Sequence, residues 1–252
     1  MGRLPVDALV VAAHPDDEVL GAGIWLHRRR DADVRVLHIT DGSPRDMQDA
    51  RKLGFSTCKQ YAEARQTELT EALALVGISH ERCIGLAFPD KEAYLHLPAI
   101  IARIRTIVEL LRPQVVLSPA YEGGHPDHDA AAFAVAAVTG ERCSLKHQEY
   151  PLYHASADGQ MVTGTFLSHA SAPEEVIRPT EAELQLKQRM IDCFTTQKQI
   201  LSRFTLGDER FRKAPAYDFR EAPHPGPLLY EIWGWGISAK QWKQEAMRCL
   251  AV

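Results

Sequence analysis

The sequence predicts an α/β fold in which a mostly parallel sheet carries helices on both faces. Short apolar runs alternate with longer segments of helical periodicity, and several of the runs are apolar throughout, as in strands buried on both faces. A chain of 252 residues can bury the core of one such domain. We therefore expect a single domain over residues 1–252. Its core would span about residues 5–140, and residues 141–252 would extend the sheet and cover the site.

The first expected strand is the apolar run at residues 8–12, and the periodic segment after it predicts a helix. His14 would cap this helix and Pro15 would take its first position, where a missing N–H costs no hydrogen bond. A second strand is expected at residues 33–40. Turn residues at 41–44 would close it, with a polar loop beyond.

Helical periodicity predicts two further helices, at residues 56–76 and 98–111, with a short strand at residues 82–86 between them. Another apolar run, at residues 113–119, predicts a buried strand, and an alanine-rich helix follows at residues 130–138. This alternation of strand and helix is what indicates a parallel sheet.

Beyond residue 140 the periodicity is weaker. The expected elements are strands at residues 149–153 and 161–166, a helix at residues 180–201 and an irregular aromatic cover at residues 214–236. Thr180 followed by Glu183 is the capping-box pattern at the start of that helix.

Composition narrows the class of function. A net charge of -4 argues against a broad nucleic-acid surface, and no apolar run approaches the length of a membrane span. The five cysteines are scattered, which favours reduced thiols over a disulfide framework. We expect a cytoplasmic protein with a small-molecule substrate, no nucleic-acid partner and no membrane span. Assembly into a homo-oligomer stays open.

Two histidine-rich turns stand out. The first, Ala13-His14-Pro15-Asp16-Asp17-Glu18, follows the first strand, and the second, Gly124-His125-Pro126-Asp127-His128, follows the strand at residues 113–119. In each turn an acid or histidine comes three residues after the first histidine. Because parallel α/β sheets place ligands at the carboxyl ends of their strands, we expect the two turns to converge.

His14, Asp17 and His128 together suit a catalytic zinc site with three protein ligands and one open position. The ion would activate a bound water as the nucleophile and polarise a carbonyl oxygen. Asp16 would act as general base and then general acid, and His125 would donate a hydrogen bond to the oxyanion. These groups describe metal-assisted hydrolysis of an amide.

Several other residues have a structural interpretation by default. Glu18 and Asp129 are expected as helix-start charges or supports of the site, and Arg65 with Glu68 as a pair on a solvated helix face. Asp90 would be a turn residue. The aromatic side chains at positions 233 and 235 are expected to pack rather than to stack on substrate.

The two turns resemble those of the PIG-L (LmbE-like) family of zinc-dependent de-N-acetylases. The similarity extends to Thr40-Asp41-Gly42, to Arg65-x-x-Glu68 and to Phe88-Pro89-Asp90. It implies a Rossmann-like α/β fold and removal of an N-acetyl group from an N-acetylglucosamine-type amino sugar or its conjugate. The family pattern agrees with the roles given above to the residues of both turns. It also implies that Arg65 and Asp90 contact the sugar.

The chain departs from the family at two places. Some members carry a tyrosine two residues before the first histidine of the second turn, where this chain has Gly123 and the nearest tyrosine is Tyr121. Lys91 stands where many relatives have glycine.

Three hypotheses for the function stay open. The first is a zinc-dependent N-deacetylase, for which Fe²⁺ is an alternative ion. The others are a metal-dependent phosphoesterase and a non-catalytic ligand-binding homologue.

Overall fold

The computed structural model of the protein describes residues 5–142, 145–167 and 173–251. Within these ranges a seven-stranded sheet has the strand order β3-β2-β1-β4-β5-β9-β8, and β6 pairs with β7 separately. The strands are β1 (Ala8–Ala12), β2 (Val34–Pro44), β3 (Cys83–Asp90), β4 (Val115–Pro119), β5 (Lys146–Tyr150), β6 (Tyr153–Ala155), β7 (Met161–Thr163), β8 (Glu174–Ile177) and β9 (Glu209–Lys213). The α-helices are α1 (Asp17–Arg28), α2 (Gln48–Lys52), α3 (Cys58–Ala74), α4 (Leu97–Leu111), α5 (Pro126–Gly140), α6 (Glu181–Asp192), α7 (Lys198–Leu201), α8 (Leu229–Ile232) and α9 (Ala239–Leu250). The 3₁₀ helices are η1 (His80–Arg82), η2 (Ala93–His96) and η3 (Thr195–Gln197).

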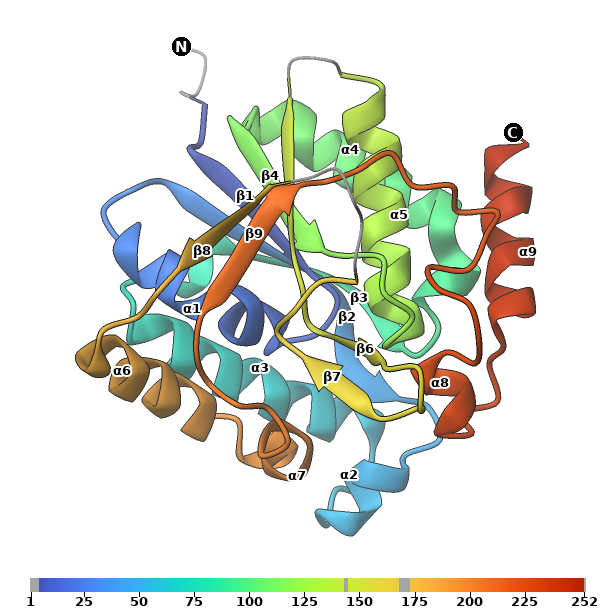
Figure 1. Ribbon diagram of the computed structural model, residues 1–252. Helices are drawn as coiled ribbons and strands as arrows, with labels where there is room; N and C mark the ends of the chain where they lie inside the picture. Colours follow the sequence, from blue (N-terminus) through green and yellow to red (C-terminus); the bar gives the residue numbers. More distant parts are fainter. Residues whose placement is uncertain (1–4, 143–144, 168–172, 252) are drawn as a thin grey trace.

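The sheet lies between two helical layers. Helices α1, α3 and α6 cover one face, and α4, α5 and α9 cover the other (Figure 1). Strands β1 to β5 run parallel, and β9 is antiparallel to both β5 and β8. The predicted α/β class with a mostly parallel, doubly covered sheet is confirmed.

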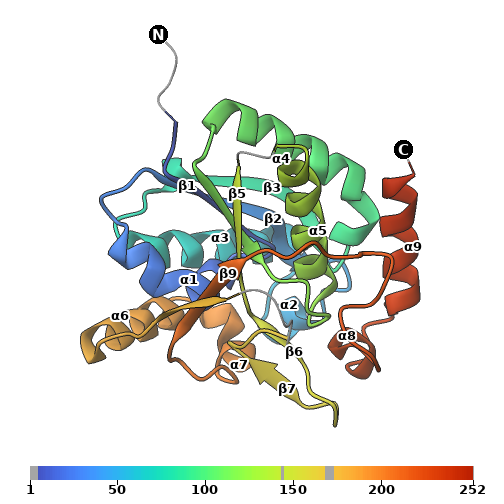
Figure 2. The same ribbon diagram turned by 45° about the horizontal axis from the view of Figure 1, so that its top comes forward.

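The order of the strands determines where the two histidine turns meet. β1 pairs in parallel with β2 on one side and with β4 on the other, in a register that sets Ala8 beside Val115. The chain therefore builds the sheet outward from β1 in one direction and then in the other. The segments after β1 and β4 leave neighbouring strands at the same edge, which is the usual ligand position in such sheets. The β6–β7 hairpin, α7 and α8 gather at that end (Figure 2).

Helix α1 is interrupted inside the protein. Ala22 has a non-helical φ of -144°, and the Glu209 carboxylate accepts hydrogen bonds from the N–H of Ile24 at 2.7 Å and of the next residue at 2.8 Å. Lys187 Nζ donates to the carbonyl of Leu20 and to Glu209, both at 2.7 Å. The buried ion pair from α6 and β9 thus supplies partners for backbone groups that the interruption leaves free.

Three predictions for the first half were wrong in detail. α1 begins at Asp17, not at Pro15 with His14 as its cap, because the Asp17 carboxylate accepts the backbone N–H groups before it and holds a separate turn. β2 continues through the expected turn at residues 41–44, because bulged pairing to β3 carries it to Pro44. The expected polar loop contains α2.

The second half departs further from prediction. The helix expected at residues 180–201 ends at Asp192, although its capping box at Thr180 is confirmed. The strand expected at residues 149–153 falls across the end of β5 and the start of β6, and β7 is shorter than expected. β8, β9 and α9 were not predicted. The two strands are short and charged, and they therefore lack a clear apolar alternation.

Two further expectations concerned membrane-spanning helices and the state of the cysteines. In the described ranges no helix combines the length and apolar character needed to cross a bilayer. The cysteines at positions 58, 83, 193 and 249 are free thiols. Cys143 lies outside the described residues.

Candidate metal centre and its pocket

The first histidine turn is held by its own aspartate. Asp17 Oδ2 accepts hydrogen bonds from the N–H groups of Ala13 and His14, at 3.0 and 2.8 Å. Asp17 Oδ1 is left facing His128 Nε2 across 3.1 Å. The carboxylate therefore shapes the turn and presents one oxygen to the second motif.

The second turn caps helix α5 with a histidine. His125 Nδ1 accepts the N–H of Asp127 at 3.1 Å, as the N-cap of that helix. A neutral His125 must then carry its proton on Nε2. That nitrogen lies 3.5 Å from Asp90 Oδ1 at the wall of the pocket. His125 is thus arranged as a hydrogen-bond donor into the site.

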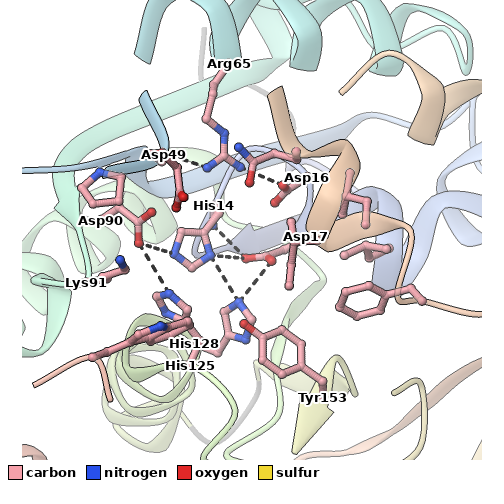
Figure 3. A pocket seen from close by; sticks show the side chains of 18 of the residues that line it. His14, Asp16, Asp17, Asp49, Arg65, Asp90, Lys91, His125, His128 and Tyr153 are labelled. Atoms are coloured by element: carbon pink, nitrogen blue, oxygen red, sulfur yellow. Dashed lines mark hydrogen bonds and ion pairs between the residues drawn. The ribbon is translucent and has the colours of Figure 1, made fainter. Parts of the chain in front are cut away.

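Potential ligand atoms of three residues converge between the turns, with one Asp17 oxygen beside each histidine (Figure 3). His14 Nδ1 lies 3.2 Å from His128 Nε2 and 3.3 Å from Asp17 Oδ2, and His128 Nε2 lies 3.1 Å from Asp17 Oδ1. Ligand atoms around a tetrahedral zinc ion are roughly 3.3–3.6 Å apart, given bond lengths of about 2.0–2.2 Å. The donor set and its spacing therefore fit a small divalent ion.

Other groupings of metal-binding residue types also include His14, with His125 and His128 or with Asp90, His125 and Asp127. His125 is the weaker candidate ligand, because one of its nitrogens is used at the helix cap and the other carries the proton. The set of His14, Asp17 and His128 requires no such rearrangement.

The outer nitrogen of His14 is also engaged. His14 Nε2 lies 3.1 Å from Asp90 Oδ1 and 3.3 Å from Asp127 Oδ2. Asp127 is itself fixed by the N–H groups of Lys91 at 2.6 Å and Ala93 at 3.0 Å. A proton on Nε2 would satisfy these carboxylates and leave Nδ1 free as a metal ligand, which is the usual support for a ligating histidine.

The electrostatics of the centre favour a cation. Burial lowers the pKa of His14, but Asp90 and Asp17 outweigh it and raise that pKa well above its usual value. Burial also opposes charge on Asp17, yet His128 and His14 hold the pKa of its carboxyl well below the usual range. A negative potential of this kind suits a divalent ion.

Asp16 lines the same cavity and is paired with Arg65. Its Oδ2 accepts a 2.7 Å hydrogen bond from Arg65 Nη2, while Arg65 Nη1 donates to the carbonyl of Gly42 at 2.8 Å. Burial raises the pKa of Asp16 to about 6, against the opposing charge of Arg65. Arg65 and Glu68 do not form the predicted solvated pair. Both are buried, and Glu68 accepts hydrogen bonds from Thr195 and the residue after it.

A cavity of about 180 Å³ opens onto this centre. Its wall includes all seven residues singled out from the sequence: His14, Asp16, Asp17, Arg65, Asp90, His125 and His128. The structure brings them together, and their individual roles stay predictions. Glu18 lies behind the centre, paired with His38 at 3.0 Å, and Asp129 accepts the N–H groups of Glu122 and Gly123.

Sequence reasoning missed much of the wall that the later elements build. Tyr153, Gln197, Phe204 and Trp235 line the cavity together with Tyr61 from α3. The ring of Trp235 packs edge-on against His125, with centroids 4.7 Å apart, so this side chain does reach the pocket. Asp127 does not line the cavity, but it supports His14 and was also missed, although its place inside the second motif could have pointed to it.

The two departures from the family pattern have structural explanations. Tyr121 is no substitute for the missing tyrosine, because its hydroxyl donates to the carbonyl of Glu221 at 2.8 Å and it does not line the cavity. Lys91 adopts a φ of +67°, a conformation that glycine takes more readily. Tyr153, by contrast, does line the cavity, and burial raises the pKa of its phenol well above the usual value, with Asp17 adding to the shift.

A family model described as PIG-L, GlcNAc-PI de-N-acetylase, matches residues 9–139, which contain both turns. The chain belongs to this family. The PIG-L match spans β1 to α5, and the elements that add Tyr153, Phe204 and Trp235 to the pocket lie beyond it.

Individual PIG-L relatives agree with this assignment. A probable N-acetyl-α-D-glucosaminyl L-malate deacetylase 2 of Bacillus anthracis is 31% identical over 59% of this chain and 65% of its own length. A 1D-myo-inositol 2-acetamido-2-deoxy-α-D-glucopyranoside deacetylase of Mycolicibacterium vanbaalenii is 29% identical over 71% of this chain and 69% of its own. The chain thus spans about two thirds of the length of these curated relatives.

A solved structure supports the fold. The zinc-inhibited form of a teicoplanin deacetylase matches 84% of this chain and 100% of its own, with a TM-score of 0.63 and 14% sequence identity. At that identity the likeness concerns the fold alone.

Proposed function

We propose that this chain is a metal-dependent amide hydrolase that removes an N-acyl group, acetyl in the first instance, from an N-acetylglucosamine-type amino sugar or its conjugate. The observation that carries the proposal is the convergence of His14 Nδ1, Asp17 and His128 Nε2 within 3.1–3.3 Å beside Asp16 and His125. The names of the curated PIG-L relatives, which act on glucosaminyl malate and glucosaminyl inositol conjugates, support the substrate class.

His14, Asp17 and His128 would hold one divalent ion, Zn²⁺ or alternatively Fe²⁺. When bound, such an ion lowers the pKa of a coordinated water and polarises a carbonyl group. In the described residues both alternative groupings of ligands include His14 and so share this one centre. That argues against the two-metal arrangement common in phosphoesterases.

The residues of the chain would then divide the work of hydrolysis. Asp16 accepts a proton from water as the water oxygen bonds to the amide carbon, and it returns that proton to the nitrogen as the C–N bond breaks. The products are a carboxylic acid and an amine, and transfer of the acid's proton to the amine leaves them as carboxylate and ammonium at neutral pH. His125 Nε2–H donates to the carbonyl oxygen while negative charge develops there. Arg65 keeps Asp16 oriented, and Arg65 and Asp90 are the candidates to contact the sugar.

The test is amine release from N-acetylglucosamine and from its inositol and malate conjugates. The protein would be stripped with a chelator and then reloaded with one equivalent of Zn²⁺ or Fe²⁺. We expect activity only after reloading. A zinc excess series belongs in the design, because the teicoplanin deacetylase is described in a zinc-inhibited form. The Asp16→Asn variant should lose on the order of 10²–10⁴-fold in kcat, the usual contribution of a general acid–base.

Four outcomes would contradict the proposal. Full activity of the chelated protein would show that hydrolysis needs no metal ion. Full activity of Asp16→Asn would show that Asp16 is not the general base. Phosphate release from ester substrates without amine release favours a phosphoesterase. One bound ion with no turnover of any N-acyl sugar favours a non-catalytic binding protein.

A further inference from the structure

The hydroxyl of Tyr153, at the wall of the pocket, has no hydrogen-bond partner among the described residues. The side chain is 7% exposed and lines the cavity, and its hydroxyl end is turned toward His128 (Figure 3). None of the hydrogen bonds found among the described residues involves this hydroxyl. The hydroxyls of Tyr121 and Tyr150 donate to backbone carbonyls at 2.8 Å. Since buried tyrosine hydroxyls usually have a partner, this one is available to a ligand.

The ring that carries this hydroxyl is held from several sides. It packs edge-on against His128 with ring centroids 5.2 Å apart, and it contacts Phe204 at 5.6 Å and Trp233 at 5.9 Å. Its backbone is paired in the β6–β7 hairpin. The hydroxyl therefore has little freedom, and a donor fixed in this way loses little entropy when it binds.

The glycines of the second turn allow this close approach. A Cβ atom on Gly124 would come within 2.0 Å of the Tyr153 carbonyl oxygen, so β6 can pack here only against a glycine. Gly123 has a φ of +71°, and a Cβ atom there would come within 2.6 Å of Leu228. A tyrosine at position 123, where some family members carry one, does not fit this backbone.

We propose that the Tyr153 hydroxyl donates a hydrogen bond to the carbonyl oxygen of the scissile amide, as a second oxyanion donor beside His125. The inference rests on the proposed function, and the donor that it names comes from β6 and not from the second turn. Tyr153 lies beyond the segment that the family model matches, so that match assigns it no role. His125 Nε2 faces Asp90 across 3.5 Å, so a second donor with no internal acceptor complements it.

The test compares the wild-type protein with Tyr153→Phe, which removes the hydroxyl and keeps the ring contacts. Tyr121→Phe is the matched control, since it also deletes one buried tyrosine hydroxyl. With the metal-loaded proteins, kcat/KM would be measured for N-acetylglucosamine conjugates. Calorimetry would give Kd values for methylphosphonate, a tetrahedral anion, and for glucosamine, the product amine. Bound metal per chain would be measured in each variant.

We expect Tyr153→Phe to lower kcat/KM on the order of 100-fold, as loss of one oxyanion donor does. The affinity for methylphosphonate should also fall, whereas glucosamine affinity and metal content stay unchanged. Tyr121→Phe should match the wild type in all four measurements. A melting temperature within about 3 °C of wild type would show that Tyr153→Phe is folded, because that shift corresponds to roughly 1 kcal/mol.

The two hypotheses fail in different ways. A wild-type protein that turns over no N-acyl sugar contradicts the proposed function. Equal methylphosphonate affinity of wild type and Tyr153→Phe contradicts the role of Tyr153, whatever the turnover. A Tyr153→Phe protein that loses metal or glucosamine affinity to the same degree also contradicts it, because the hydroxyl would then be shaping the site as a whole.

Discussion

Arg65 bridges two segments of the site: its Nη2 donates to Asp16 Oδ2 at 2.7 Å and its Nη1 donates to the Gly42 carbonyl at 2.8 Å. Gly42 has a φ of +66°, and a Cβ atom there would come within 2.5 Å of the guanidinium. The bulged end of β2 is therefore built around this arginine. Arg65 thus first positions Asp16, whatever contact it also makes with a sugar.

The Arg65→Lys variant tests that relationship. A lysine ammonium is a single point charge on a flexible stem and cannot reproduce the two-armed contact. We expect kcat to fall on the order of 100-fold, because Asp16 would no longer be held in line with the reacting atoms. Arg35→Lys, which alters a peripheral pair with Asp33, is the control. A raised KM with unchanged kcat would instead indicate that Arg65 only binds substrate.

An Asp90 variant can distinguish support of the metal ligand His14 from contact with the sugar. It faces His14 Nε2 at 3.1 Å, so Asp90→Asn should lower metal affinity by about 10- to 100-fold, as loss of a carboxylate behind a ligating histidine does. Competition with a chromophoric chelator measures this. Asp41→Asn, outside the cavity, should keep wild-type affinity. If Asp90 serves only the sugar, its variant will keep full metal affinity and show a higher KM.

We expect His147 to make the folded protein less stable at acid pH. Burial lowers its pKa to about 4, and its ring nitrogens contact the neutral hydroxyls of Ser118 at 2.9 Å and Thr139 at 3.3 Å. The unfolded chain takes up this proton near pH 6.5 and the folded chain only near pH 4. His147 therefore does not reduce the free energy of unfolding above pH 6.5. As the pH falls from 6.5 toward 4, the free energy of unfolding decreases by at most about 3 kcal/mol because of this residue.

The measurement compares urea unfolding at pH 7 and pH 5 for the wild type and His147→Gln. Other titratable groups also act on the stability of the wild type between these pH values, so the difference between the two proteins is the informative quantity. The variant should lose less stability between the two pH values. Identical losses in both proteins would show that His147 titrates alike in the folded and unfolded chains.

The pair of Lys187 and Glu209 is expected to be a stability element. Lys187→Met leaves the Glu209 carboxylate buried with only backbone N–H partners, so the free energy of unfolding should fall by about 3–5 kcal/mol. Adding Glu209→Gln should recover part of this loss. Arg210 lies next to Glu209 on β9, and Arg210→Met, which breaks its partly exposed pair with Glu174 of β8, should cost under about 1 kcal/mol. A Lys187→Met loss as small as that of the control would overturn this assignment.

The fold was predictable where local signals are strong. The apolar run of β1, the periodicity of α3 and α4, and the strand before the second turn gave the class of the sheet and its parallel direction. Those signals fade beyond residue 140, where β8 and β9 are short and charged. They join the sheet through pairing with β5 and with each other, and no pattern within either strand records that pairing.

The sequence by itself determined that two histidine turns follow buried strands, and this was enough to name His14, Asp16, Asp17, His125 and His128 as one site. Arg65 and Asp90 were added only by the family resemblance. Only the tertiary structure decided what those residues face. Strand order sets β1 beside β4, the path of α3 brings Arg65 to Asp16, and the β6–β7 hairpin brings Tyr153 over His128. A motif records which side chains a turn carries, whereas contacts between residues far apart in the chain depend on register and packing across the whole sheet.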